Sequence, residues 1–203
     1  MRAALVLALT LLPGGPGQRA PGAESGGTPA DSSARSPSFA QAFDLRVLHG
    51  RARLAQGQEV RTLSASDEPY RGRGEAALGL GSEGLAELSW RSRASLRLTG
   101  PAELEWSTLD GAGDLQILVG AAGTLDLEAR RGGVRLELSQ GWRLEVGEAA
   151  LQISQEPQGG WSVRHHGGRA VRVRSRIPRE KNDWPRLLRS GERLRLPPSR
   201  RSG

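Results

Sequence analysis

The feature that most constrains this chain is a regular alternation of apolar and polar residues, which is clearest over residues 134–146. The apolar positions in this stretch are Val134, Leu136, Leu138, Trp142, Leu144 and Val146. The charged positions between them are Arg135, Glu137, Arg143 and Glu145. Successive side chains of a β-strand point to opposite faces of a sheet. The pattern therefore predicts strands with their apolar side chains in a core and their charged side chains facing solvent.

Similar alternating runs recur from residue 51 to residue 175, with Gly-rich breaks between them. In the second half, strand centres are predicted near positions 116, 126, 136, 144, 152, 162 and 172. This spacing of about eight to ten residues is typical of all-β folds. We therefore predict an all-β domain of many short antiparallel strands, as a twisted solenoid-like roll or a β-sandwich, with little helix. One helical turn is expected within residues 182–191, which begin with capping residues and end at Gly191.

The N-terminal residues predict export. Met1 and Arg2 precede an apolar run over residues 3–12, and small residues follow as far as Ala20 and Ala23. This order is typical of a secretory signal peptide that is cleaved after one of these alanines. A helix of about ten residues covers about half of a hydrocarbon core, so we expect no transmembrane span. The expected location is periplasmic or extracellular. The predicted segments are a signal peptide (1–20), a disordered linker (21–38), the all-β domain (39–197) and a basic tail (198–203).

Side chains that carry catalysis or bind metals are scarce. The sequence has no Cys, which excludes disulfides and thiolate ligands, and its three histidines are His49, His165 and His166. Adjacent strand positions face opposite ways, so His165 and His166 cannot both enter one site, and we expect them in a solvated turn. Glu103 and Glu105 share one strand face and are expected to face solvent. We therefore expect no catalytic residue, no metal and no cofactor, and predict that the protein is not an enzyme.

Five tryptophans supply most of the aromatic mass. Trp106, Trp142 and Trp161 share the numbering parity of neighbouring apolar residues, so we predict that they fill the core. The pattern around Trp184 assigns it neither to the core nor to the surface, where an exposed ring could stack on a sugar.

Basic residues concentrate near the C-terminus. Residues 161–203 contain 13 Lys or Arg and 3 Asp or Glu, a net of 13 − 3 = +10, whereas residues 1–160 contain 16 and 19, a net of 16 − 19 = −3. Such a segment favours an anionic partner, although a general preference for Arg in the sequence explains the excess equally well. The candidate contacts are Arg169, Arg172, Arg174 and Arg176. We expect no nucleic acid, because no aromatic and basic binding motif accompanies the charge.

The alternating segments follow one another in a recognisable order. They read GRARLAQGQEVRT, AALGLGSEGLAELSW, LRLTGPAELEW, LQILVGAAGTLDL, VRLELSQGWRLEVGEAALQI, GGRAVRV and LLRSGERLRL. The matched positions are Gly57 and Thr62 in a first turn, Gly120 and Gly123 in a mid-domain turn, and Leu188, Gly191 and Glu192 in a closing strand. Over residues 45–197 this order resembles the FecR-type periplasmic domain.

The resemblance implies an extracytoplasmic, β-rich interaction module. The best-known FecR-type proteins relay a signal from an outer-membrane transducer to an anti-sigma segment across the inner membrane. The matched segments include neither that anti-sigma portion nor a membrane helix. For this chain the resemblance therefore implies a stand-alone, exported, sensor-like domain of a bacterial envelope.

Two functional hypotheses follow from the sequence. The leading one is a non-catalytic, extracytoplasmic FecR-like binding module with a sensor or signalling role, whose exposed strand edges bind an envelope protein by strand addition. The alternative is a basic cell-envelope protein that binds an anionic polysaccharide or lipid through the four arginines named above.

Overall fold

A computed structural model describes most of the predicted domain. The described residues are 42–91, 93–108, 114–131, 133–176 and 185–198. All helices and strands assigned in them are β-strands, which confirms the all-β prediction. The described residues contain no helix that is long and apolar enough to cross a membrane. The predicted signal peptide, the linker, Trp184 and the tail from residue 199 lie outside the described residues.

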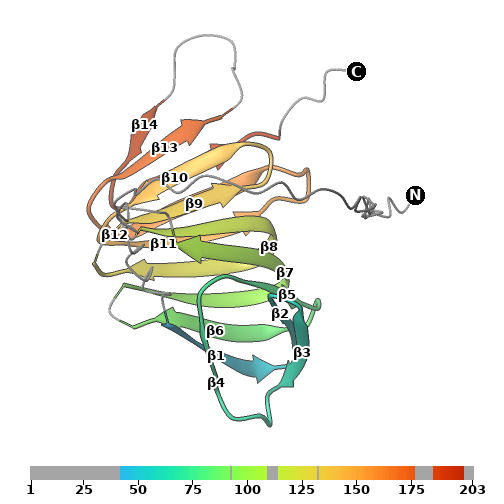
Figure 1. The fold of residues 1–203 in the computed structure, drawn as a ribbon. Helices are drawn as coiled ribbons and strands as arrows, with labels where there is room; N and C mark the ends of the chain where they lie inside the picture. The colour runs from blue at the N-terminus through green and yellow to red at the C-terminus, as the bar shows by residue number, and fades with distance from the viewer. Residues whose placement is uncertain (1–41, 92, 109–113, 132, 177–184, 199–203) are drawn as a thin grey trace, which may run out of the picture. The chain divides into compact units, whose positions relative to one another are not determined.

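Fifteen strands follow one another along the described chain (Figure 1). Their bounds are β1 (Ala42–His49), β2 (Arg51–Gln56), β3 (Glu59–Ser64), β4 (Tyr70–Arg73), β5 (Ala76–Leu80), β6 (Leu85–Trp90), β7 (Ala94–Thr108), β8 (Leu115–Ala129), β9 (Val134–Leu138), β10 (Trp142–Val146), β11 (Ala149–Gln155), β12 (Trp161–Gly168), β13 (Val171–Ser175), β14 (Arg186–Leu188) and β15 (Arg193–Leu196). The centres predicted near 136, 144 and 152 fall in β9, β10 and β11. Those predicted near 116 and 126 belong to one long strand, β8.

Hydrogen bonds join these strands into one sheet that is folded into two layers. Layer I has the order β4, β1, β6, β7, β8, β11, β12 and β15. Layer II has the order β3, β2, β5, β7, β8, β9, β10, β13 and β14. β7 and β8 belong to both layers, because the first half of β7 pairs with β6 and its second half pairs with β5. Every pairing among the described strands is antiparallel except that of β8 with β9, which is parallel.

The two long strands bend from one layer into the other at glycines. The pairing of β7 with β8 places Gly100 and Pro101 opposite the single residue Gly123. An extra residue of this kind bends a strand and increases its twist. A Cβ at Gly123 would lie 2.5 Å from the carbonyl oxygen of Gly100, so no side chain fits there. The mid-domain turn predicted at Gly120 and Gly123 is therefore wrong, because both glycines lie inside β8.

Aromatic rings fill the space between the layers at the N-terminal end of the domain. Phe43 on β1 packs edge-on against Trp106 on the second half of β7, with ring centroids 4.9 Å apart. Trp90 on β6 packs against the same Trp106 ring at 5.7 Å. Phe43 and Trp90 belong to layer I, whereas this part of β7 belongs to layer II. The inner faces of the two layers therefore meet in one core, as in a β-sandwich.

Two further tryptophans connect the layers by hydrogen bonds at the C-terminal end of the domain. The indole N–H of Trp142 on β10 donates to the carbonyl oxygen of Pro197, beyond β15, at 3.1 Å. The indole N–H of Trp161 on β12 donates to the carbonyl oxygen of Ser139, beyond β9, at 3.2 Å. Trp106, Trp142 and Trp161 are all buried, which confirms their assignment to the core.

The helical turn predicted within residues 182–191 is wrong over its described part. Residues 186–188 form β14, and the chain turns at Ser190 and Gly191. The pairing of Leu188 with Val171 places both side chains in the core. Pairing with a distant strand and burial of Leu188 therefore outweigh the local preference for a helical turn.

His165 lies in the core rather than in a solvated turn, because β12 continues as far as Gly168. Its side chain is fully buried, and neither ring nitrogen has a hydrogen-bond partner. The next residue, His166, is exposed on the opposite face. The prediction that the two imidazoles face opposite ways is thus confirmed, whereas the prediction that both are solvated is wrong.

The buried imidazole leads to a stability prediction. Replacing His165 with Leu removes two unpartnered polar atoms from the core at similar side-chain volume, and should stabilise the protein by about 1–2 kcal/mol. The measurement is urea unfolding followed by circular dichroism. The matched control is His166→Leu, whose exposed position should change the free energy of unfolding by less than about 0.5 kcal/mol. A destabilised His165→Leu variant would contradict the assignment of the ring as unpartnered.

Candidate functional site

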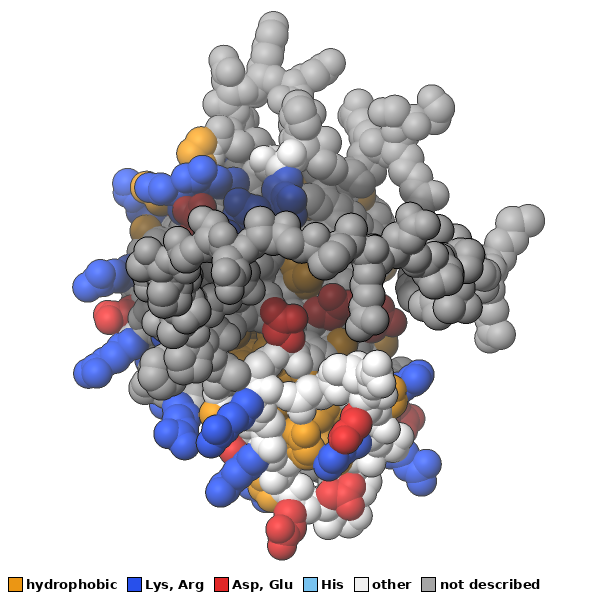
Figure 2. Space-filling view, in the orientation of Figure 1, with side chains coloured by type: hydrophobic (Ala, Val, Ile, Leu, Met, Phe, Trp, Pro, Cys, Tyr) orange, Lys and Arg blue, Asp and Glu red, His pale blue; other side chains and the backbone are white. Residues whose placement is uncertain are grey.

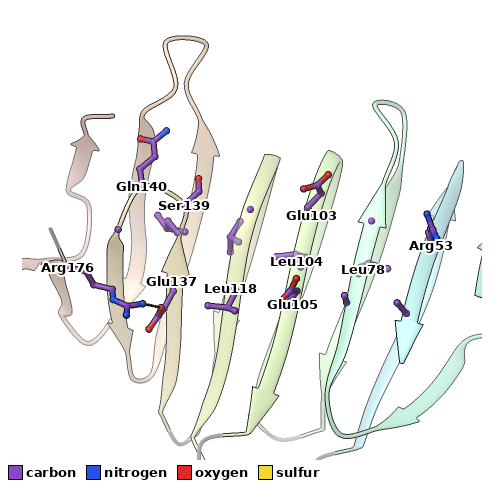
Figure 3. A pocket seen from close by; sticks show the side chains of 17 residues that line it. Arg53, Leu78, Glu103, Leu104, Glu105, Leu118, Glu137, Ser139, Gln140 and Arg176 are labelled. Atoms are coloured by element: carbon purple, nitrogen blue, oxygen red, sulfur yellow. Dashed lines mark hydrogen bonds and ion pairs between the residues drawn. The ribbon is translucent and has the colours of Figure 1, made fainter. Parts of the chain in front are cut away.

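The outer face of layer II is hollowed by a groove of about 750 Å³ (Figure 3). It extends from Arg53 on β2, across β5, β7, β8 and β9, to Arg176 after β13. We call it the layer II groove and define it by the lining residues Arg53, Ala77, Gly79, Glu103, Glu105, Leu118, Gly120, Glu137 and Arg176. Figure 3 shows Glu103 and Glu105 on one strand, Leu118 on the next and Glu137 on the one after it.

Strand register sets the order of the side chains across this groove. One transverse row, read from β10 to β2, consists of Arg143, Glu137, Leu118, Glu105, Ala77 and Ala55. Adjacent strands lie about 4.8 Å apart, so the row is about 24 Å long. Along it the chemical character changes from basic to acidic, then to apolar, then to acidic, and finally to two small side chains.

Small residues make the groove deep near β5. Gly79 and Ala77 face outward on β5, and Gly120 on β8 is exposed and lines the same groove. A Cβ added at Gly79 would have no heavy atom within 4 Å, so the space above it is open. A hollow on a sheet face arises where large outward side chains are missing. These three residues have at most a methyl group as a side chain and therefore leave the groove open.

The exposed large apolar side chains lie on this face, one near its middle and one at each edge. Among the described residues they are Val60 at 54% exposure, Leu118 at 38% and Leu187 at 58%. Val60 pairs with outward-facing Ala55, and Leu187 pairs with outward-facing Arg172. Cross-strand partners share a face, so all three apolar side chains lie on the outer face of layer II.

Two carboxylates are shared among four arginines at the C-terminal end of the same face. Glu137 accepts a hydrogen bond from Arg143 at 2.8 Å and forms a second ion pair with Arg176. Its side chain is only 8% exposed, so the prediction that it faces open solvent is wrong, because the two guanidinium groups cover it. Glu145 forms the other shared pair, with Arg172 at 3.7 Å and Arg174 at 3.5 Å.

The four predicted anion contacts therefore occupy two places. Arg172, Arg174 and Arg176 come together on the outer face of layer II, each in an ion pair with Glu137 or Glu145. Arg169 lies in the connection before β13 and pairs instead with Glu148 at 3.8 Å. Each guanidinium has five N–H donors, so these ion pairs leave donors free for a further carboxylate, sulfate or phosphate group.

Glu103 and Glu105 are exposed, which confirms the prediction that they face solvent. No described residue forms an ion pair with either carboxylate. Their register partners on β5 and β8 are uncharged, namely Gly79, Ala77, Ala121 and Leu118. Alternation indicated their direction, but their uncharged surroundings come from two other strands, β5 and β8, and could not be predicted from the sequence.

The outer face of layer I differs in character. It carries a second hollow, of about 660 Å³, lined by charged residues of both signs and by His166. Register places Arg97 between Glu87 and Asp126, and Gln152 donates a hydrogen bond to Asp126 at 3.0 Å. The charges on this face therefore alternate between neighbouring strands and already have complementary neighbours.

An ion pair at the margin of this face changes two pKa values. The hydrogen bond from Arg130, and then its charge, lower the pKa of the Glu128 carboxyl group. The same hydrogen bond raises the pKa of Arg130. Both groups are exposed, so salt screens the interaction and its contribution to stability is small.

No protein-family model matches the sequence, and no curated protein matches it. A solved structure described as a "putative anti-sigma factor" from Parabacteroides distasonis aligns with a TM-score of 0.47 and 11% sequence identity. The alignment covers 62% of this chain and 61% of that chain. What the outer faces of the two layers can bind therefore follows from their own residues.

Proposed function

We propose that this protein is a non-catalytic interaction module of FecR type that binds an envelope protein through the outer face of layer II. The observation that carries the proposal is the position of Val60, Leu118 and Leu187, because all three exposed large apolar side chains of the described residues lie on this face. Leu118 lines the groove, whereas Val60 and Leu187 lie on the two edge strands of the same face. An exposed apolar side chain in a hollow, with charged residues at its margin, is typical of protein-binding surfaces. Figure 2 shows acidic and hydrophobic side chains near the middle of one face and Lys and Arg side chains toward its upper left.

The strand edges are less suitable than this face. Three of the four outermost strands, β4, β14 and β15, have only three or four residues. The fourth, β3, carries Arg61, which pairs with Glu59 at 2.8 Å and lies 5.4 Å from the centre of the Tyr70 ring. Short edge strands and charged side chains on them discourage pairing with a further strand. The sequence suggested that a partner binds at the strand edges. We propose instead that the partner binds at the sheet face.

Export is part of the proposal, and it rests on the order of basic, apolar and small residues in the first 23 positions. A fusion of residues 1–38 to an alkaline phosphatase that is active only outside the cytoplasm should give active enzyme. The mass of the mature protein should correspond to cleavage after Ala20 or Ala23. An inactive fusion whose protein accumulates in the cytoplasm would overturn this part.

The binding face can be tested with a photo-reactive residue in the full-length chain. Position 118 should cross-link one discrete envelope protein at both low and high salt, because an apolar contact resists screening. Position 152, on the outer face of layer I, is the matched control and should give no such product. Equal cross-linking from both positions, or none from 118, would contradict the proposal.

A second candidate, binding of an anionic polysaccharide or lipid, is favoured by the four arginines that share only two carboxylates. Under this alternative the protein would bind dextran sulfate at low salt, would release it at high salt, and would lose it in an Arg172→Ala/Arg174→Ala variant. The same variant would leave the cross-link from position 118 unchanged. The two candidates therefore give different results in the same pair of experiments.

A further inference from the structure

The layer II groove has a charge polarity that specifies its partner more closely than the proposed function does. Toward β7 it presents Glu103 and Glu105, which pair with no described residue. Beyond β9 the groove is lined by Arg176, which pairs with the buried carboxylate of Glu137, and Arg143 pairs with the same carboxylate from β10. Leu118 lies between the two ends. Apart from Arg53 at its β2 margin, the groove is therefore acidic toward β7, apolar at Leu118 and basic toward β13.

The spacing of these groups follows from the strand order. Glu105 on β7 is separated from Arg143 on β10 by three strand intervals and from β13, which Arg176 directly follows, by four. At about 4.8 Å for each interval, these separations are about 14 and 19 Å. An extended chain advances about 3.3 Å per residue, so about four to six residues bridge the two ends.

The acidic end fits one cationic side chain. Glu103 and Glu105 lie two residues apart on one strand face, so their Cα atoms are about 7 Å apart, and a Lys or Arg between them can contact both carboxylates. The aliphatic stem of such a residue would lie over Gly79, above which the space is open. Neutralisation of two unpaired carboxylates by one cation is a strong source of specificity.

The basic end fits an anionic side chain. Arg143 and Arg176 each use one or two of five donors on Glu137, and the exposed fraction of the Arg176 side chain is 56%. A carboxylate from a partner could therefore bind there without displacing Glu137.

We infer that the groove binds an extended partner segment in which a Lys or Arg and an Asp or Glu stand four to six residues apart, with an apolar residue between them. The cation contacts Glu103 and Glu105, the apolar side chain covers Leu118, and the anion contacts Arg143 and Arg176. The inference rests on the proposed function, since it names the chemistry of the partner that the outer face of layer II binds.

The test is selection of peptides from a phage-displayed library of random 12-residue sequences on the immobilised full-length protein. Selected peptides should share the predicted charge pair and spacing. The affinity of one synthetic peptide with this consensus should fall about tenfold or more in the Glu103→Gln/Glu105→Gln variant. Glu87→Gln, on the outer face of layer I, is the matched control and should leave the affinity unchanged. The unfolding temperature should be the same in all three proteins, because these carboxylates are exposed.

Charge reversal makes the test stricter. A Glu103→Lys/Glu105→Lys variant should bind a peptide in which the Lys or Arg is replaced by Glu, and should reject the original. The inference is overturned if no peptide is enriched, if enriched peptides lack the charge pair, or if they bind the Gln variant equally well. A cross-link from position 118 that persists in any of these cases would leave the proposed function standing, so the two failures can be told apart.

Discussion

Replacing Trp142 with Ala should lower the free energy of unfolding by about 3–5 kcal/mol, the largest loss we expect from one side chain. The ring of Trp142 is fully buried between the layers, and its N–H donates to the carbonyl oxygen of Pro197 at 3.1 Å. The substitution leaves a cavity and removes the hydrogen bond that holds the segment after β15 against β10. For a domain of this size the loss corresponds to a fall in the unfolding temperature of about 10 °C.

Thermal unfolding followed by near-UV circular dichroism measures this effect. Leu187→Ala is the matched control, because Leu187 is 58% exposed, and it should shift the free energy of unfolding by less than about 0.5 kcal/mol. Trp142→Phe keeps an aromatic ring but loses the donor, so it should fall between the two. An unchanged unfolding temperature for Trp142→Ala would show that the ring does not fill the core.

Replacing Gly100 with Ala should cost about 3 kcal/mol or more, at the upper end of what overpacking costs. A Cβ at Gly100 would lie 1.7 Å from the carbonyl oxygen of Gly81, which belongs to the turn between β5 and β6. The N–H of Gly100 also donates to the carbonyl oxygen of Gly84 at 2.7 Å. The methyl group must therefore push this turn away from the bend of β7, where the chain passes from layer I to layer II.

Gly79→Ala is the matched control, since Gly79 also lies in a strand but has no heavy atom within 4 Å of its Cβ position. It should leave stability unchanged or raise it by about 0.4–1 kcal/mol, because Ala restricts the unfolded chain. Urea unfolding of the two variants measures the difference. Equal effects of the two substitutions would mean that the turn between β5 and β6 does not pack on the bend.

Much of the fold was predictable because side-chain direction along a strand is a local property. Alternation placed Val134, Leu136, Leu144 and Val146 in the core, and all four are buried. Predictions of where one strand ends and the next begins were less accurate. The glycines of β8 produce a bend rather than a turn. The parts of β8 before and after the bend remain paired with neighbouring strands, in two different layers.

Two errors had a similar origin. Gly167 and Gly168 suggested a turn at His165, but pairing with β11 and β15 keeps the chain extended and buries the imidazole. Capping residues and Gly191 suggested a helical turn within residues 182–191, but pairing with β13 makes residues 186–188 a strand. In both cases hydrogen bonds to a distant strand outweighed the local preference of a few residues.

In the candidate site, too, the direction of each side chain was predictable, whereas its neighbours were not. The sequence alone determined that Glu103, Glu105, Arg172 and Arg174 point away from the core, because the period of two is set by the backbone of each strand. Leu118 lies beside Glu105 and Glu137 because β7 pairs antiparallel with β8 and β8 pairs parallel with β9, and no local pattern indicates these pairings. Which side chains become neighbours depends on strand order and register, and these are fixed by long-range hydrogen bonds and by burial of the shared core. A chain can thus encode the two faces of each strand locally, while the surface that a partner meets exists only when the strands are assembled.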